Sequence, residues 1–182
     1  MHRKSFSQFI IISGSGKKVG KTYMATALIR AFSGQFPLLA LKISPHVHDS
    51  LGNTILRSAS PGIRIFQDTG PHRKNSGMFL EAGAMESYFM ETEDEYLSEA
   101  LDIFLRECNP LNYPVICESG ALSRLIKPGI SIFITHTTIH LEVHKQSSLA
   151  QADLALPAGA FLAPEIIDRI GFSENGWYTA TV

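Results

Sequence analysis

The stretch from Phe9 to Thr22, FIIISGSGKKVGKT, constrains the fold of this chain more than any other segment. It begins with four apolar residues, a run typical of a strand that is buried on both faces of a parallel sheet. A loop rich in Gly, Ser and Lys follows and ends in Gly20-Lys21-Thr22. Beyond it, apolar residues recur at helical spacing between positions 24 and 31. Strand, glycine-rich loop and helix in this order are the context that a phosphate-binding loop requires.

The chemistry of such a loop gives a role to each of its parts. Free N–H groups at a helix N-terminus and the positive end of the helix dipole attract phosphate oxygens, and glycines let the backbone approach them closely. We expect Lys21 to reach the β- and γ-phosphates and the Thr22 hydroxyl to ligate Mg²⁺. The residues expected to contact the nucleotide are Gly14, Ser15, Gly16, Lys17, Lys18, Val19, Gly20, Lys21, Thr22 and Tyr23.

The loop departs from the usual pattern, G-x-x-x-x-G-K-[ST], at its first glycine. Ser15 occupies that position, while Gly14 lies one residue earlier and Gly16 lies inside the loop. The alternative interpretation is a surface turn rich in Gly and Lys before an amphipathic helix. The position of the G-K-T triplet at the junction of strand and helix disfavours that alternative.

Composition limits the classes to which the chain can belong. Its 182 residues predict one domain, residues 1–182. The net charge of −1 does not favour nucleic-acid binding. No apolar run approaches about 18 residues and the first eight residues contain no signal-peptide core, so we expect a cytoplasmic protein without a membrane partner. Cys108 and Cys117 are expected to be buried thiols rather than a disulfide or a redox pair.

The remaining patterns predict an α/β fold: a three-layer, P-loop NTPase-type arrangement in which a mostly parallel sheet carries helices on both faces. Residues 50–74 favour a long loop or a hairpin with a short strand at 63–67. Thr92 and Glu95 form a predicted capping box for a helix that ends near Asn109. Further strands are predicted at 36–43, 85–90, 113–118, 130–135 and 152–156, and further helices at 21–34, 76–84 and 163–170.

Polar residues follow two of these strands. His46, His48 and Asp49 come after the second strand, at the edge where ligands of open α/β sheets gather. Glu118 ends the strand at 113–118, where a carboxylate can bind Mg²⁺ through water or orient an attacking group. The alternative is a charge that marks the exit of this strand to solvent.

Three histidines follow the strand at 130–135 at intervals of four residues: His136, His140 and His144. This spacing would stack three imidazoles on one helical face as a candidate zinc site. The β-branched residues 137–139 weaken the helix prediction and therefore disfavour the zinc site.

With these residues in view, the chain resembles the P-loop NTPases that include dethiobiotin synthetase. Gly14-x-x-x-x-Val19-Gly20-Lys21-Thr22 has the spacing of the synthetase loop. Lys42 stands where that family carries a lysine that contacts substrate and phosphate, and Glu118-Ser119-Gly120-Ala121 looks like its acidic strand end. The resemblance implies catalytic roles for Lys21, Lys42 and Glu118, and Thr22, Asp49 and Glu118 as Mg²⁺ ligands.

Other segments resemble the molybdopterin-guanine dinucleotide biosynthesis protein B (MobB) group. Lys42-x-x-x-His46-x-His48-Asp49 is similar to its histidine-rich segment after the second strand. Lys74-Asn75-Ser76, followed by Ala82-Gly83-Ala84, is similar to its K-D-S…A-G-A segment. Asn75 replaces the aspartate of that segment, and Met78 stands where an arginine is common. The resemblance covers about residues 8–135.

The resemblance implies Mg²⁺-dependent binding and slow hydrolysis of ATP or GTP by an accessory protein of molybdenum cofactor biosynthesis that acts on a partner enzyme. One alternative is a synthetase-like enzyme that phosphorylates a small carboxylate or carbamate substrate. A second alternative is a regulatory switch that forms a homodimer across the nucleotide. No N-K-x-D segment follows a late strand, so the choice between adenine and guanine stays open.

Overall fold

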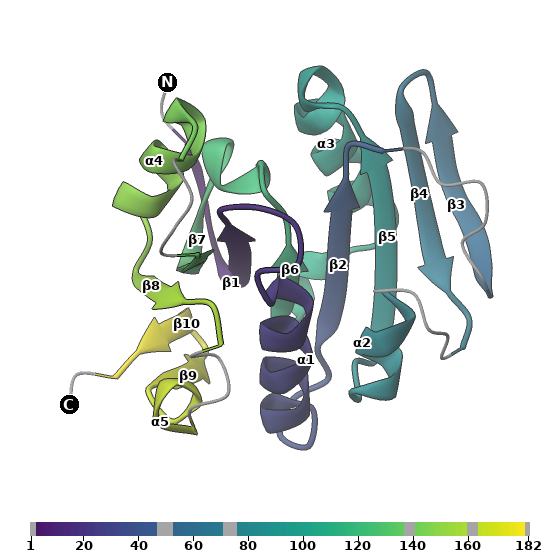
Figure 1. Ribbon diagram of the computed structural model, residues 1–182. Coiled ribbons are helices and arrows are strands. Elements are labelled where there is room, and N and C mark those ends of the chain that lie inside the picture. Colours follow the sequence, from purple (N-terminus) through teal and green to yellow (C-terminus); the bar gives the residue numbers. More distant parts are fainter. Residues whose placement is uncertain (1–2, 47–52, 71–75, 137–140, 160–163, 181–182) are drawn as a thin grey trace.

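A sheet of eight strands runs through the computed structural model of the chain (Figure 1). The structure describes residues 3–46, 53–70, 76–136, 141–159 and 164–180. In chain order, the strands of this sheet are β1 (Lys4–Gly14), β2 (Leu39–Ser44), β3 (Thr54–Ser60), β4 (Ile63–Asp68), β5 (Glu86–Thr92), β6 (Val115–Glu118), β7 (Ile126–Thr135) and β8 (Leu154–Pro157).

The strands lie in the order β3-β4-β5-β2-β6-β1-β7-β8. The pairs from β5 to β8 are parallel, whereas β4 pairs in antiparallel fashion with both β3 and β5. The hairpin of β3 and β4 forms one edge of the sheet, and β8 forms the other (Figure 1). Of the two structures expected for residues 50–74, the described part shows the hairpin, and β4 contains the strand predicted at 63–67.

The helices and a second, smaller sheet complete the described part of the chain. None of the helices in the described ranges is long and apolar enough to cross a membrane. The helices are α1 (Lys21–Phe32), α2 (Gly77–Glu81), α3 (Leu97–Glu107), α4 (Val143–Ala150) and α5 (Pro164–Ile167), and the small antiparallel sheet consists of β9 (Ile170–Ser173) and β10 (Gly176–Thr179).

Alternate residues of β1 face two separate hydrophobic cores, as the period of a strand requires. Ile10 and Ile12 pack in one core with residues of α1 and α2, whereas Phe9 and Ile11 pack in the other with residues of α3. All four side chains are fully buried. In Figure 1, α1 and α2 lie in front of the sheet and α3 lies behind it. The architecture is a mostly parallel α/β sheet, consistent with the predicted three-layer fold.

The capping box predicted at Thr92 and Glu95 is wrong. Thr92 is the last residue of β5, where it pairs with Ile63 of β4, and its hydroxyl donates to the carbonyl oxygen of Glu93. A 3₁₀ turn spans Asp94–Tyr96, so α3 begins only at Leu97. Pairing in the sheet therefore holds Thr92 in an extended conformation, and no side chain caps the start of α3 in the described residues.

The helix predicted at 163–170 is also wrong in its second half. The structure describes α5 only over Pro164–Ile167, and Ile170 begins β9 instead. The hairpin turn contains Gly176 at φ 103, where a Cβ atom would lie 2.4 Å from the carbonyl oxygen of Ser7. Contact of the hairpin with β1 therefore decides the structure of this segment, and the helical period of the sequence does not.

Candidate functional site

The loop between β1 and α1 depends on two glycines. A Cβ atom at Gly14 would lie 2.6 Å from the carbonyl oxygen of Ile134 and 2.9 Å from Cγ2 of Val19. Gly20 is the N-cap of α1 and has φ 107, a left-handed conformation that favours glycine. Gly14 is therefore required by its close packing against β7, although the usual motif places its first glycine one residue later.

Ser15, which occupies the position of the first glycine in the usual motif, forms hydrogen bonds with residues at the end of β7. Its N–H group donates to the carbonyl oxygen of Ile134 at 2.9 Å, and its hydroxyl oxygen accepts the N–H of His136 at 3.0 Å. The side chain is buried. A glycine could make the first of these bonds, so the serine adds the second, in which its hydroxyl oxygen accepts the N–H of His136.

The turn of the loop presents unpaired backbone donors. Within the described ranges, the N–H groups of residues 16–20 have no hydrogen-bond acceptor. No side chain from these ranges caps the N-terminus of α1, and its first intrahelical bond runs from Met24 N–H to the carbonyl oxygen of Gly20. Backbone donors and the positive end of a helix dipole together form a site suited to an anion.

The side chains of the loop divide into two groups. Val19 is buried in the core beside α1, so it can offer a ligand only its backbone. Lys17, Lys18 and Tyr23 are exposed, and Lys18 adopts a positive φ of 60. The side of the loop that faces the core is therefore apolar, and the side that faces solvent carries two lysines.

Lys21 folds back over the loop, and its Nζ donates to the carbonyl oxygen of Gly16 at 2.5 Å. Burial is the main cause that lowers the pKa of Lys21. The positive charges of Lys42 and Lys145 act in the same direction, and the negative charge of Glu118 opposes them. An ammonium group in these surroundings is stabilised by a further anion.

Glu118 lies at the centre of the polar cluster, with a side chain that is 7% exposed. Its Oε1 lies 2.6 Å from Nζ of Lys42, and its Oε2 accepts a hydrogen bond from the Thr22 hydroxyl at 2.7 Å. The sheet register explains this proximity, because Glu118 is the direct neighbour of Lys42 on β2 and of Ile12 on β1. The alternative interpretation of Glu118 as a charge that marks an exit to solvent is therefore wrong.

The oxygens of Thr22 and Glu118 suit Mg²⁺, which is usually bound by one or two protein oxygens together with substrate phosphates and water. The described residues contain no group of three or more His, Cys, Asp and Glu side chains that could hold a metal alone. A magnesium ion at Thr22 would therefore depend on phosphate oxygens for much of its coordination. Asp49, the third predicted ligand, lies outside the described residues, as do His48 and Asn75.

The three predicted histidines do not share one helical face. His136 directly follows β7 and is not helical, and its N–H group bonds to Ser15. His144 lies in the first turn of α4, with its imidazole 3.3 Å from the carboxylate of Glu142. His140 lies outside the described residues. His136 therefore does not share a helical face with His144, and the candidate zinc face, which residues 137–139 disfavoured, is not formed at His136.

A cavity of about 210 Å³ adjoins the loop at the carboxyl edge of the sheet. It is bounded by Ser13 and Gly14 of β1, by Ser119 after β6, and by Arg124 and Lys145. The sequence interpretation missed both cations, because Arg124 lies in a short 3₁₀ turn and Lys145 on a helix that no motif marks. The cavity therefore adds two cationic groups to those named from the sequence.

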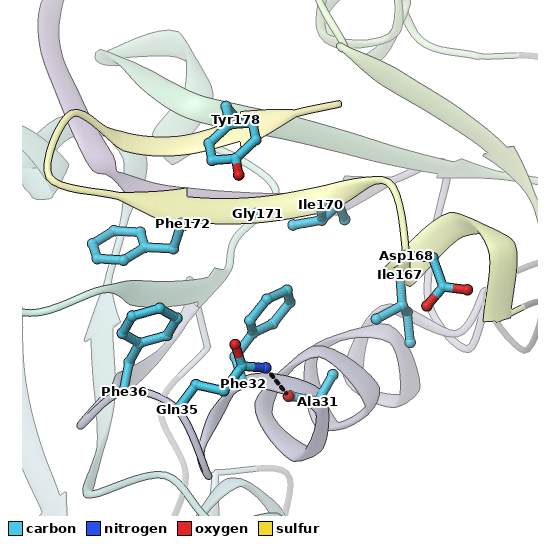
Figure 2. Close-up of a pocket in the computed structure, with 10 residues that line it drawn as sticks. All are labelled: Ala31, Phe32, Gln35, Phe36, Ile167, Asp168, Ile170, Gly171, Phe172 and Tyr178. Atoms are coloured by element: carbon cyan, nitrogen blue, oxygen red, sulfur yellow. Dashed lines mark hydrogen bonds between the residues drawn. The ribbon is translucent and has the colours of Figure 1, made fainter. Parts of the chain in front are cut away.

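A larger cavity, of about 330 Å³, lies at the opposite end of α1 (Figure 2). Figure 2 shows Phe36 and Phe172 together at one end of it, where their rings form an edge contact with centroids 5.2 Å apart. The amide of Gln35 is bonded to the carbonyl oxygen of Ala31. Asp168 is the one charged residue among the described residues that line it. This cavity has no lysine or arginine among its described lining residues, so it does not suit phosphate. The candidate phosphate site is therefore the N-terminal end of α1.

Comparisons of the chain with protein-family models, with curated proteins and with solved structures found no match. Its function therefore has to be inferred from the residues of the site.

Proposed function

We propose that this chain binds a nucleoside triphosphate with Mg²⁺ at the loop between β1 and α1, and hydrolyses it slowly. The observation that carries the proposal is the convergence of Thr22, Lys42 and Glu118 beside the unpaired N–H groups of the loop. Donors for phosphate, cations for its charge and oxygens for a metal thus lie in one site. This combination is what phosphoryl chemistry uses, because its catalysis rests on positioning and charge stabilisation.

Each group has a role in this proposal. The N–H groups of residues 16–20 bind phosphate oxygens, and Lys21 exchanges the carbonyl oxygen of Gly16 for the β- and γ-phosphates. The Thr22 hydroxyl and Glu118 hold Mg²⁺ directly or through water, and the ion neutralises phosphate charge. Lys42 keeps the Glu118 carboxylate in place through their ion pair.

For the biological role, we propose a MobB-like accessory protein of molybdenum cofactor biosynthesis that acts on a partner enzyme. The support is the resemblance of residues 42–49 and 74–84 to that group. Asn75 and Met78 replace an aspartate and an arginine common in its members. We therefore expect slow turnover that a partner protein changes.

A second candidate function is that of a synthetase-like enzyme, and the cavity beside the loop favours it. Its volume of about 210 Å³ is below the about 300–1,000 Å³ of pockets for drug-sized ligands, so it suits a small molecule. Arg124 and Lys145 on its wall suit an acidic substrate such as a carboxylate or carbamate, which would compete with their present ion-pair partners, Asp94 and Glu142.

Steady-state hydrolysis of ATP and GTP with Mg²⁺ tests the two functions against each other. Slow turnover that small acids leave unchanged supports the accessory role, whereas turnover that appears only with a small carboxylate or carbamate supports the synthetase. Sedimentation with and without nucleotide adds a third arm, since dimerisation that requires nucleotide supports a regulatory switch. Absence of any nucleotide effect in both experiments would contradict the proposed site.

A further inference from the structure

Lys145 brings a third lysine to the phosphate site from a distant part of the chain. It lies on α4 and lines the cavity together with Ser13 and Gly14, where the phosphate-binding loop begins. Its side chain is 27% exposed, whereas that of Glu142, its ion-pair partner on the preceding turn, is 64% exposed. The lysine is therefore more buried than its partner and forms part of the cavity wall.

The charges around the loop do not balance. Lys42 and the Thr22 hydroxyl both engage the carboxylate of Glu118, and Lys21 contacts only a carbonyl oxygen among the described residues. Lys145 lines the same cavity as Gly14, the first residue of the loop, and so adds a positive charge at the start of the loop. Ammonium groups gathered beside one loop repel each other, and an anion bound among them relieves the repulsion.

We propose that Lys145 is a further phosphate-binding residue, which contacts the terminal phosphate of the bound triphosphate from the side of the cavity. The inference rests on the proposed function. With the inner phosphates at the loop N–H groups, as the proposed function has them, the terminal phosphate is the one that can extend toward the cavity beside Ser13 and Gly14. Lysine suits this role because its ammonium group binds phosphate as a compact point charge on a flexible stem.

The competing explanation is a solvated pair of Lys145 and Glu142 on the surface of α4. Such a pair, at a spacing of three residues on an exposed helix surface, contributes little to stability. It gives Lys145 no reason to distinguish a triphosphate from a diphosphate. Selectivity between these two ligands therefore separates the explanations.

The test measures dissociation constants of a non-hydrolysable triphosphate analogue and of the matching diphosphate, both with Mg²⁺. The variants are Lys145→Gln and Lys145→Arg, with Lys127→Gln on the exposed far end of β7 as the control for loss of charge. We expect Lys145→Gln to weaken triphosphate binding about tenfold and to leave diphosphate binding within about twofold, because one charge-assisted contact is lost. Lys145→Arg should restore most of the selectivity, and Lys127→Gln should not alter it.

Equal weakening of both ligands by Lys145→Gln, or no change in either, would overturn the role of Lys145. Circular dichroism of each variant shows whether α4 and the fold are kept. If the wild-type chain binds the triphosphate and Lys21→Ala does not, a failure of Lys145→Gln to change selectivity overturns this inference alone. If the wild-type chain binds neither ligand, the proposed function fails and this inference fails with it.

Discussion

Thr22 and Glu118, which are 96 residues apart in the chain, are joined by a hydrogen bond of 2.7 Å at the carboxyl edge of the sheet. The bond links the first turn of α1 to the end of β6. The other oxygen of the same carboxylate is held by Lys42 of β2. A metal or phosphate that binds at Thr22 would therefore change the contacts among α1, β6 and β2.

Lys21→Ala should abolish triphosphate binding and leave the fold intact. The variant removes the ammonium group that is held over the loop, and its alanine keeps the helix, since alanine has the highest helix propensity. Titration calorimetry measures the affinity, and thermal unfolding checks the fold. Lys127→Ala, at an exposed position, is the matched control. Unchanged affinity in Lys21→Ala would rule out the phosphate-binding loop.

Glu118→Gln should lower the rate of hydrolysis more than it lowers nucleotide affinity. The amide keeps the shape of the side chain and still accepts a bond from Thr22, but it loses the charge that supports a metal-bound water. Single-turnover rates and equilibrium binding are measured on the same preparation. Equal loss of both quantities, or of neither, would assign Glu118 a structural role only.

Lys42→Met should destabilise the fold by about 3–5 kcal/mol, because it leaves the carboxylate of Glu118 buried without its ion-pair partner. The double variant Lys42→Met/Glu118→Gln should recover much of that loss, since the buried charge is then absent. Chemical denaturation of the two single variants and the double variant gives the coupling energy. Additive effects would show that the two side chains do not interact.

Gly14→Ala and Gly16→Ala form a matched pair in one loop. The first places a methyl group 2.6 Å from the carbonyl oxygen of Ile134, so the backbone must shift, at a cost of about 1–3 kcal/mol. The second meets no atom of the described residues within 4 Å, so the change in stability should stay within about 0.5 kcal/mol. Denaturation midpoints of the two variants check this difference. Equal midpoints would contradict the packing of the loop against β7.

The two cysteines should resist alkylation in the folded protein. Both are free thiols, and burial is the main cause that raises the pKa of Cys108 to about 11 and raises that of Cys117 as well. A thiol in the unfolded chain ionises near pH 9, whereas burial keeps the thiol of Cys108 protonated up to about pH 11. The raised pKa therefore contributes to the free energy of unfolding below pH 9, and this contribution is lost as the pH rises toward 11. Iodoacetamide labelling at pH 8 should be slow without denaturant and fast with it.

Cys108→Ala provides the comparison for the pH dependence. The fall in unfolding free energy between pH 9 and pH 11 should be smaller in this variant than in the wild type, because one raised pKa is removed. An identical fall in both proteins would show that Cys108 does not titrate as its burial requires.

The central part of the fold could be predicted from the sequence because its signals are local. The apolar run before the loop, the helical period after it and the acidic end of β6 each mark one element, and the structure contains all of them. The sequence did not predict the position of Glu118 beside Lys42, because that neighbourhood depends on the strand order and on the register of β2 against β6.

The remaining features depend on tertiary contacts that no local pattern records. Thr92 reads as a helix cap but is held in β5 by its pairing with β4. Ile170 continues a helical period but lies in a hairpin that packs on β1. Lys145 belongs to no motif and reaches the site only because α4 packs near the end of β1. Sequence patterns therefore identified the loop between β1 and α1 but missed Arg124 and Lys145, which line the cavity beside it.

Calorimetric titration of the full chain with non-hydrolysable ATP and GTP analogues, with and without Mg²⁺, tests whether the loop between β1 and α1 binds a nucleoside triphosphate. We expect micromolar binding of at least one analogue, which requires Mg²⁺ and is lost in Lys21→Ala. A preference for the guanine analogue would favour the MobB-like role, and a preference for the adenine analogue would favour the synthetase. If neither analogue binds, the proposed nucleotide site is wrong, and the loop, in which Ser15 occupies the usual glycine position, serves the fold alone.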